Sequence, residues 1–214
     1  KSIGSGRISS QTMYAIKKAL EYGYFFDNPA FKESIANAER SHSKLHIIGL
    51  LSDAGGHSHI DHLFGIFRCL LNAGFKERIF IHVITDGRDV PPKSAMKYIR
   101  LLKNTIVNSG LNAKIASIGG RYWGMDRGEN WDRVEKHYKA MLGTATTKIK
   151  ENAVEEYIEN SYRKGVFDEF LEPATVINNE GNAIGEIESK DSVMFFNFRP
   201  DRMKELLSCF YEKD

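Results

Sequence analysis

The chain has 214 residues, 42% of them hydrophobic and 27% charged, and this balance is typical of one globular domain with a sizeable core. The 30 basic residues nearly cancel the 28 acidic ones, so no overall positive charge favours nucleic acid as a partner. No apolar run is long enough for a membrane span, and no signal peptide precedes the first helix. The two cysteines are far apart and fit a reducing compartment, so we expect a cytoplasmic protein.

The first part of the chain predicts a linker, two helices and a buried strand. Residues 1–9 are rich in glycine and serine and predict the linker. Helical periodicity covers residues 10–22 and 29–40, with Asn28 as a cap and Pro29 at the first helical position of the second helix. The apolar run Leu45–Leu51 predicts a strand that is buried on both faces.

Helices and strands then alternate along the chain. Ser58 and Asp61 have the spacing of a capping box in front of a helical stripe over residues 63–71. Further strands are predicted over residues 78–85, 114–118 and 192–198, helices over 95–106, 131–141 and 154–162, and a hairpin over 174–187 that turns at 179–181. This alternation predicts an α/β fold with a mainly parallel sheet, helices on both faces and a small β-hairpin.

Polar residues cluster where four of these strands end. The clusters are SDAGGHSH, DGRD, GGRYWGMDR and RPDR, and ligands of open α/β sheets bind at the carboxyl ends of the strands. The fold would bring together His57, Arg88, Asp89, Arg121, Arg127, Arg199 and Arg202. Guanidinium groups suit carboxylate and phosphate oxygens, which indicates a small polyanion as ligand.

A structural alternative is that each arginine is neutralised within its own loop. The candidate partners are Asp53, Asp86, Asp89, Asp126 and Asp201. Asp89 has two further interpretations, because it could accept a hydrogen bond from a substrate hydroxyl or orient Arg88. His57 follows two glycines at the start of a helix, where free backbone N–H groups favour an anion.

The same stretch also matches the H-x-H-x-D-H spacing of two-metal zinc hydrolases, through His57, His59, Asp61 and His62. Such a site needs more ligands downstream, but His82 lies inside a predicted strand and His137 inside a predicted helix. We therefore expect no metal ion on this chain. His59 and His62 are interpreted as surface or packing residues.

The motifs LLSDAGGHSHIDHL, DGRDVPPKSA, GGRYWGMDRGENWDRVEKHY and FFNFRPDR, in this order, closely resemble the cofactor-independent (2,3-bisphosphoglycerate-independent) phosphoglycerate mutases. The likeness runs from about Gly4 through Arg202, with a departure at Ala54 and Gly56, where the family often reads SDGGVHSH. It implies that residues 10–203 form the substrate-binding phosphotransferase domain, inserted in an alkaline-phosphatase-like chain. Residues 204–214 would then begin the linker or helix that leads back to the metal-binding domain.

The resemblance also implies an activity. Such an isomerase interconverts 2-phosphoglycerate and 3-phosphoglycerate in glycolysis and gluconeogenesis, through a phosphoserine on the other domain. Two divalent metal ions, manganese by expectation, would be held by that domain in cis, and 2,3-bisphosphoglycerate would not be required. His57, Arg88, Asp89, Arg121 and Arg127 would hold the glycerate part, while Arg199 and Arg202 face the phosphoryl group.

The sequence begins at Lys1 and contains neither the serine motif nor the metal-ligand set of that family, so we expect a part of a longer, monomeric enzyme that is inactive alone. The alternative is a stand-alone module that binds small anions without catalysis.

Overall fold

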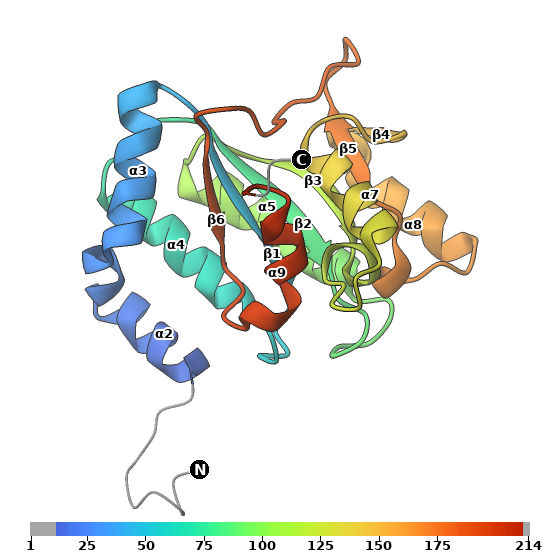
Figure 1. Cartoon of the computed structure of the whole chain (residues 1–214), viewed down its shortest axis with the longest axis horizontal. Coiled ribbons are helices and arrows are strands. Elements are labelled where there is room, and N and C mark those ends of the chain that lie inside the picture. Colours follow the sequence, from blue (N-terminus) through green and yellow to red (C-terminus); the bar gives the residue numbers. More distant parts are fainter. Residues whose placement is uncertain (1–11, 212–214) are drawn as a thin grey trace, which may run out of the picture.

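The computed structural model describes residues 12–211, so the predicted linker and the first two residues of the first predicted helix lie outside the described residues. The core is a six-stranded sheet in the order β4-β5-β3-β2-β1-β6 (Figure 1). All neighbours are parallel except β3 and β5, which confirms the mainly parallel α/β sheet. The strands are β1 (Leu45–Leu51), β2 (Ile79–Thr85), β3 (Ala113–Gly120), β4 (Thr147–Lys150), β5 (Ala174–Ile177) and β6 (Ser192–Phe195).

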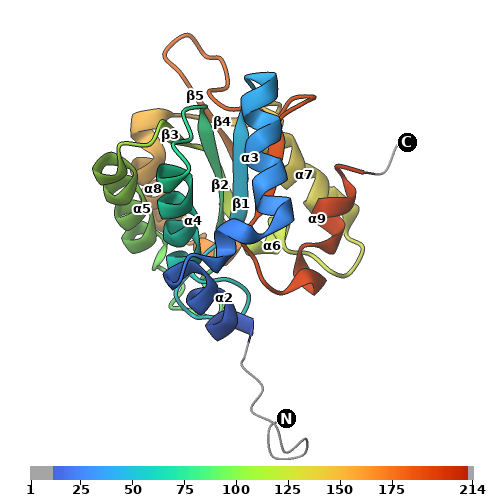
Figure 2. The same ribbon diagram turned by 90° about the vertical axis from the view of Figure 1, so that its left-hand side faces the viewer.

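Helices cover both faces of the sheet (Figure 2). The longer ones are α2 (Thr12–Glu21), α3 (Pro29–Ser41), α4 (Ile60–Asn72), α5 (Ala95–Ser109), α7 (Trp131–Met141) and α8 (Val154–Arg163). The short ones are α6 (Arg121–Gly124), α9 (Lys204–Ser208), η1 (Tyr24–Asp27), η2 (Glu151–Ala153), η3 (Asp168–Phe170) and η4 (Pro200–Arg202). No helix within residues 12–211 is long and apolar enough to cross a membrane.

Two hydrophobic cores lie on opposite faces of β1. Leu45 and Ile47 belong to the larger core, to which α3, α4, α5 and α8 contribute. Ile48 and Leu50 belong to the smaller core, under α7 and α9. All seven residues of β1 are buried, as its continuous apolar run predicts. The strand is therefore fixed from both sides, and the loop that follows it starts from a rigid position.

The helix caps agree with the sequence in one case and differ in another. The Oδ1 atom of Asn28 accepts hydrogen bonds from the first N–H groups of α3, as predicted. The predicted capping box at Ser58 is wrong. The Ser58 hydroxyl donates to the carbonyl of Leu50 at the end of β1, and His59 caps α4 by accepting from the Asp61 N–H at 3.2 Å.

The last third of the chain departs most from the predicted elements. The hairpin predicted over residues 174–187 is short: it has one bridge, between Ile177 and Ala183, and the Ile184 N–H donates to the Val176 carbonyl at 3.1 Å. β5 pairs instead with β4 along its length and with β3 at its first two residues. The predicted strand over residues 192–198 ends at Phe195. Beyond it the Asn197 side chain, rather than the backbone ladder, accepts from the Leu50 N–H at 2.9 Å.

Candidate anion-binding site

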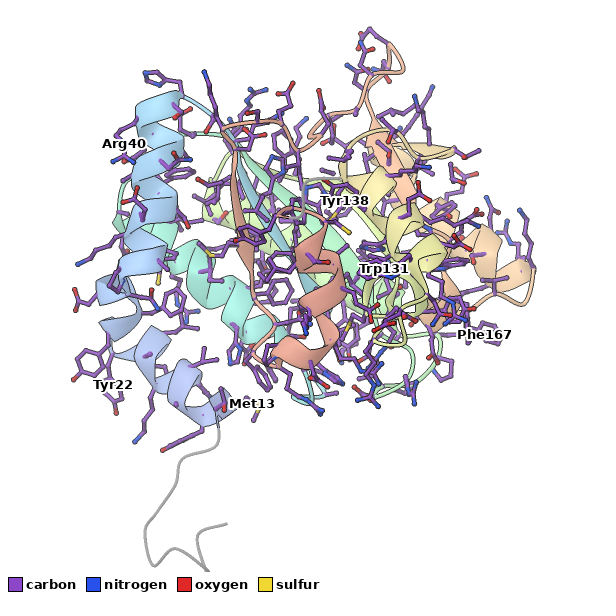
Figure 3. The ribbon with its side chains drawn as sticks, viewed as in Figure 1. Met13, Tyr22, Arg40, Trp131, Tyr138 and Phe167 are labelled. Carbon is purple, nitrogen blue, oxygen red and sulfur yellow. The ribbon has the colours of Figure 1, made fainter. Side chains whose placement is uncertain are left out.

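The predicted site residues follow four parallel strands, so they gather at one edge of the sheet. His57 follows β1, Arg88 and Asp89 follow β2, and Arg121 begins α6 directly after β3. Arg127 lies between α6 and α7, while Arg199 and Arg202 lie after β6, at η4. The turn carrying His57 contains Gly55 at φ +72°. Met13, at the start of α2 (Figure 3), lies against this glycine. The strand-end prediction therefore holds for the placement of all seven residues.

Arg121 is the buried centre of this cluster, with only 4% of its surface exposed. Its Nη1 atom lies 2.6 Å from Oδ1 of Asp86 and 2.7 Å from Oδ2 of Asp89. Burial alone would lower the pKa of Arg121, but the two carboxylates outweigh burial and raise it. Arg121 is therefore a permanent cation that joins the loops after β2 and β3.

Asp86 also fixes the backbone of the loop after β2. Its Oδ1 atom accepts from the N–H groups of Arg88 at 3.2 Å and of Asp89 at 3.1 Å. Burial would raise the pKa of Asp86, but its hydrogen bonds, including those from Arg121 and the Asp89 N–H, lower it overall. Asp86 thus stays ionised and holds this turn in one conformation.

His57 faces the same pair of charges. Its Nε2 atom lies 3.7 Å from Oδ2 of Asp89, and its Nδ1 atom is buried without a hydrogen-bond partner among the described residues. Burial lowers the pKa of His57, and the positive charge of Arg121 lowers it further, while Asp89 acts in the opposite direction. The imidazole is therefore neutral at neutral pH.

The outer arginines have weaker, more exposed partners. Arg199 holds both oxygens of Asp201 at 3.1 Å, and Nη1 of Arg127 lies 3.5 Å from the same carboxylate. Arg88 lies 3.5 Å from Glu169 of η3. More than half of each arginine side chain is exposed, so these pairs are weak enough to exchange for a ligand anion.

Arg202 has no carboxylate partner among residues 12–211. Its Nη1 atom donates to the carbonyl of Met125 at 3.4 Å, and its Nε atom is buried without a partner in the described part of the chain. Burial lowers the pKa of Arg202, and the charges of Arg127, Arg121 and Arg88 lower it further. Because several cations act on one another here, this edge of the sheet favours an anion.

The aspartates expected to neutralise the arginines do so only in part. Asp86, Asp89 and Asp201 pair with site arginines, as described above. Asp53 instead accepts from Tyr98 and Lys97 of α5, and Asp126 binds Asn130, Arg133 and the backbone of its own loop. Asp89 pairs with Arg121 and not with Arg88, so its expected role in orienting Arg88 is wrong.

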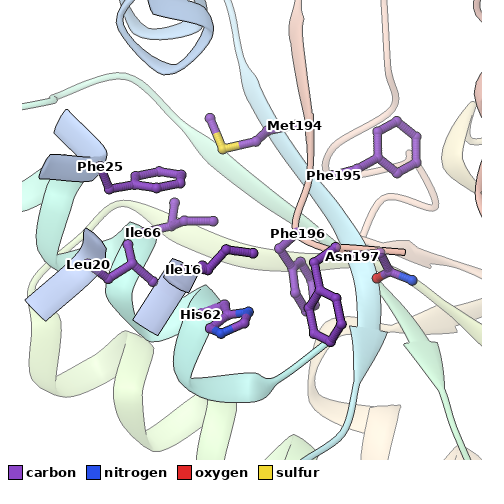
Figure 4. Close-up of a pocket in the computed structure, with 10 residues that line it drawn as sticks. Ile16, Leu20, Phe25, His62, Ile66, Met194, Phe195, Phe196 and Asn197 are labelled. Atoms are coloured by element: carbon purple, nitrogen blue, oxygen red, sulfur yellow. The ribbon is translucent and has the colours of Figure 1, made fainter. Parts of the chain in front are cut away.

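The zinc-like spacing does not produce a metal centre in the described residues. His57 faces Asp89, His59 caps α4, and the ring of His62 packs against Phe198 at a centroid distance of 5.7 Å. His62 also lines a small apolar cavity of about 100 Å³ between α2, α4 and the segment around β6 (Figure 4). No group of three or more His, Cys, Asp or Glu side chains within residues 12–211 could hold a metal ion.

The sequence did not reveal η3 as part of the site. Its Glu169 pairs with Arg88, and its backbone lies under the glycines that precede the site residues. A Cβ atom on Gly120 would lie 2.2 Å from the Glu169 carbonyl oxygen, and one on Gly87 would lie 2.7 Å from the Glu169 N. The only sequence signal of this contact is the glycine in each of the DGRD and GGRYWG motifs.

Comparison with known proteins gives one consistent family. A family model described as "BPG-independent PGAM N-terminus (iPGM_N)" matches residues 16–214. Proteins named 2,3-bisphosphoglycerate-independent phosphoglycerate mutase from Clostridium tetani, and phosphoglycerate mutase 1 of the same kind from Methanosarcina barkeri, are 42% and 41% identical over 100% of this chain. A crystal structure of Leishmania mexicana phosphoglycerate mutase at low cobalt concentration superposes with a TM-score of 0.90, at 30% identity over 98% of this chain and 39% of that chain.

The match covers only part of these relatives. The chain spans 40% of the Clostridium tetani protein and 41% of the Methanosarcina barkeri protein. Within that part the match extends over 213 residues of this chain, so it spans the segments that carry the arginine cluster. The chain therefore belongs to the 2,3-bisphosphoglycerate-independent phosphoglycerate mutase family, as the region described by its N-terminal model.

Proposed function

We propose that this chain is the substrate-holding part of an isomerase that interconverts 2-phosphoglycerate and 3-phosphoglycerate. The observation that carries the proposal is the cluster of arginines at one sheet edge, in which Arg202 has no carboxylate partner among the described residues. Family membership supports it, because relatives of greater length are named phosphoglycerate mutases. A further domain in cis would supply the serine that accepts the phosphoryl group.

The arrangement suggests how the substrate is held. We assign His57, Arg88, Arg121 and Arg127 to the glycerate part of the substrate, because guanidinium groups suit carboxylate oxygens. The carboxylate of Asp89 is 32% exposed, and we assign it to accept a hydrogen bond from a glycerate hydroxyl. Arg199 and Arg202, on the loop after β6, are the arginines that we assign to the phosphoryl group. Asp201 would release Arg199 and Arg127 as the anion arrives.

Phosphoryl transfer needs a nucleophile and cations that neutralise the developing charge. Within residues 12–211 no cluster of ligands fits a metal ion, so we derive no metal-dependent step from this chain. The resemblance implies manganese in the complete enzyme, and the Leishmania mexicana relative was crystallised with cobalt. The name of the relatives supports a reaction without 2,3-bisphosphoglycerate.

The proposal is tested by titrating the chain with 3-phosphoglycerate while NMR signals of the arginine side chains are followed. We expect a dissociation constant on the order of millimolar, because a few charge-assisted hydrogen bonds act in an open, hydrated site. Arg202→Gln should weaken binding, whereas Arg68→Gln, which removes an exposed arginine from α4, serves as the matched control. Absence of shifts at high ligand concentration would refute the substrate-holding role.

The same sample tests where catalysis resides. In a coupled assay with manganese added, we expect no interconversion of 2-phosphoglycerate and 3-phosphoglycerate by this chain alone. Turnover would show that the nucleophile lies within the chain. Binding without turnover agrees with both a substrate-holding domain and a stand-alone anion-binding module. Restored turnover on adding back the rest of a family member's chain distinguishes the domain from the module.

A further inference from the structure

The loop that carries His57 is attached to α5 through one carboxylate. Asp53, the second residue after β1, accepts a hydrogen bond from the Tyr98 hydroxyl at 2.6 Å and from the Lys97 ammonium group at 2.9 Å. Tyr98 is 3% exposed, whereas 41% of the Asp53 side chain is exposed. The buried Tyr98 hydroxyl on α5 thus holds the partly exposed Asp53 carboxylate on the loop.

The two ends of this loop are fixed independently of Asp53. At the start of the loop, the Ser52 carbonyl accepts a hydrogen bond from the Ile60 N–H at 2.8 Å. Near its end, the His57 carbonyl accepts a hydrogen bond from the Phe198 N–H at 2.9 Å. Between these points lie Asp53, Ala54 and two glycines, whose small side chains offer little packing area. The link from Asp53 to α5 is therefore the side-chain anchor of residues 53–56, while the Ser58 hydroxyl, through the Leu50 carbonyl, anchors the end of the loop.

The other end of the link is rigid. α5 packs in the larger core through Tyr98 and Ile99, and its first N–H groups, those of Ser94 and Ala95, both donate to the buried carboxylate of Asp168 at 2.7 Å. The hydroxyl of Tyr98 therefore has a fixed position relative to the sheet. Asp53 transmits this position to the loop that carries His57.

We propose that Tyr98 is a positioning residue for the anion site, which acts through Asp53 to hold the loop of residues 52–59 and, with it, His57 beside Asp89. Its effect on ligand affinity rests on the proposed function, but its effect on the loop does not. Tyr98 itself is not one of the seven predicted site residues. It carries no charge at neutral pH, and burial and the bond to Asp53 raise its pKa still further above neutral.

Tyr98→Phe tests this role, since it removes one hydroxyl and leaves charge and ring packing unchanged. Tyr157→Phe is the matched control, because that hydroxyl donates to the Glu172 carbonyl at 2.8 Å and not to the loop of residues 52–59. In Tyr98→Phe, amide hydrogen exchange of residues 53–58 should accelerate about tenfold, and 3-phosphoglycerate should bind about threefold more weakly. In Tyr157→Phe neither quantity should change.

The titration of His57, followed through its ring protons without ligand, gives a second readout. A looser loop exposes the imidazole, so its pKa should rise from its lowered value in Tyr98→Phe and not in Tyr157→Phe. Lys97→Met, which removes the other donor to Asp53 from an exposed side chain, should shift exchange and titration in the same direction by a smaller amount.

The outcomes separate this inference from the proposed function. If amide exchange of residues 53–58 and the titration of His57 are the same in Tyr98→Phe as in the parent, Tyr98 only fills the core and the positioning role is refuted. If the loop loosens but 3-phosphoglycerate binds as before, the role in the site is refuted too. If the parent shows no binding at all, the proposed function fails, while exchange and His57 titration still decide whether Tyr98 holds the loop.

Discussion

Arg121 and Arg127 are six positions apart and belong to the same predicted site, yet their surroundings differ. Arg121 is 4% exposed and joins Asp86 to Asp89, whereas 58% of the Arg127 side chain is exposed. Removing one partner of a buried ion pair leaves charges without compensation in a poorly solvated place. Removing one partner of an exposed pair leaves a hydrated carboxylate. The two arginines should thus contribute differently to folding.

Arg121→Ala is therefore expected to lower the free energy of unfolding by about 3–5 kcal/mol, because Asp86 and Asp89 lose their shared counter-ion. Arg127→Ala should change it by less than about 1 kcal/mol. Urea denaturation, followed by circular dichroism, measures both. Under the proposed function, each substitution should also raise the transition-state barrier of the complete enzyme by about 2–5 kcal/mol. Equal stability of the two variants would contradict the assignment of Arg121 as a buried structural cation.

At the scale of elements, the contact between β3 and η3 brings the site loops into register. Gly120 ends β3, and its N–H donates to the Leu171 carbonyl at 2.7 Å. The space that a side chain would occupy at Gly120 is filled by backbone atoms of Asp168 and Glu169. These atoms cannot rotate out of the way as a side chain could. Arg121 follows directly, so any displacement of Gly120 moves the central arginine.

Gly120→Ala should consequently lower the free energy of unfolding by about 1–3 kcal/mol and weaken 3-phosphoglycerate binding, because the added methyl group meets the Glu169 carbonyl. Gly165→Ala is the control. Gly165 has φ +75° and open space around it, so alanine there strains the backbone by about 1 kcal/mol but displaces no neighbour. Thermal unfolding and ligand titration of both variants test this, and unchanged binding in Gly120→Ala would oppose it.

The sequence predicted the elements that have a strong local pattern. β1 and β2 read as apolar runs because both of their faces are buried, and the strand-end rule then placed the seven site residues. β4 was missed because TKIK has four residues and alternates exposed lysines with a single buried isoleucine. The predicted hairpin turn does exist, with the Asn178 side chain accepting from the backbone N–H groups of residues 180 and 182.

The hairpin and the contribution of η3 to the site could not be predicted, because both depend on contacts between segments far apart in the sequence. Nothing local in ATVI indicates that β5 pairs with β4 and, through Ala174 and Thr175, also with β3. Within the described residues, the segment after Asn182 therefore pairs with β5 only at Val176 and Ile177. The placement of Glu169 beside Arg88 likewise depends on backbone contacts between segments about eighty residues apart. Sequence periodicity carries no information on such contacts.

Across the whole molecule, a chain of buried polar groups connects three strands. The hydroxyl of Ser117 lies 2.8 Å from Nδ1 of His82, Nε2 of His82 lies 2.9 Å from Nδ1 of His46, and Nε2 of His46 lies 3.0 Å from Asp191. With both rings neutral, each contact has one donor: Ser117 donates to His82, His82 donates to His46 through Nε2, and His46 donates to Asp191 through Nε2. Both histidines are fully buried, and they are hydrogen-bonded rather than merely packed.

These histidines predict how stability depends on pH. Burial lowers the pKa of His137 to about 4 and lowers those of His46 and His82 as well. The unfolded chain therefore binds more protons below pH 6.5, and the free energy of unfolding should fall as the pH drops from about 7 to 4. His137 alone contributes about 3 kcal/mol to this loss.

Urea unfolding measured across this pH range tests the prediction. His137→Gln should flatten the slope, because it removes a group that gains a proton on unfolding. His42→Gln should leave the slope unchanged, since 86% of that side chain is exposed. A stability that stays constant between pH 7 and 4 would contradict the neutral, buried state of these rings.

The position of β6 has a consequence for biosynthesis. β1 lies between β2 and β6, and Leu45 is opposite Ser192, so one edge of β1 is completed by a segment that leaves the ribosome long after it. Until then the loops with His57, Arg88 and Arg121 lack Arg199 and Arg202. Under the proposed function, phosphoglycerate would therefore stabilise only molecules whose synthesis has passed β6.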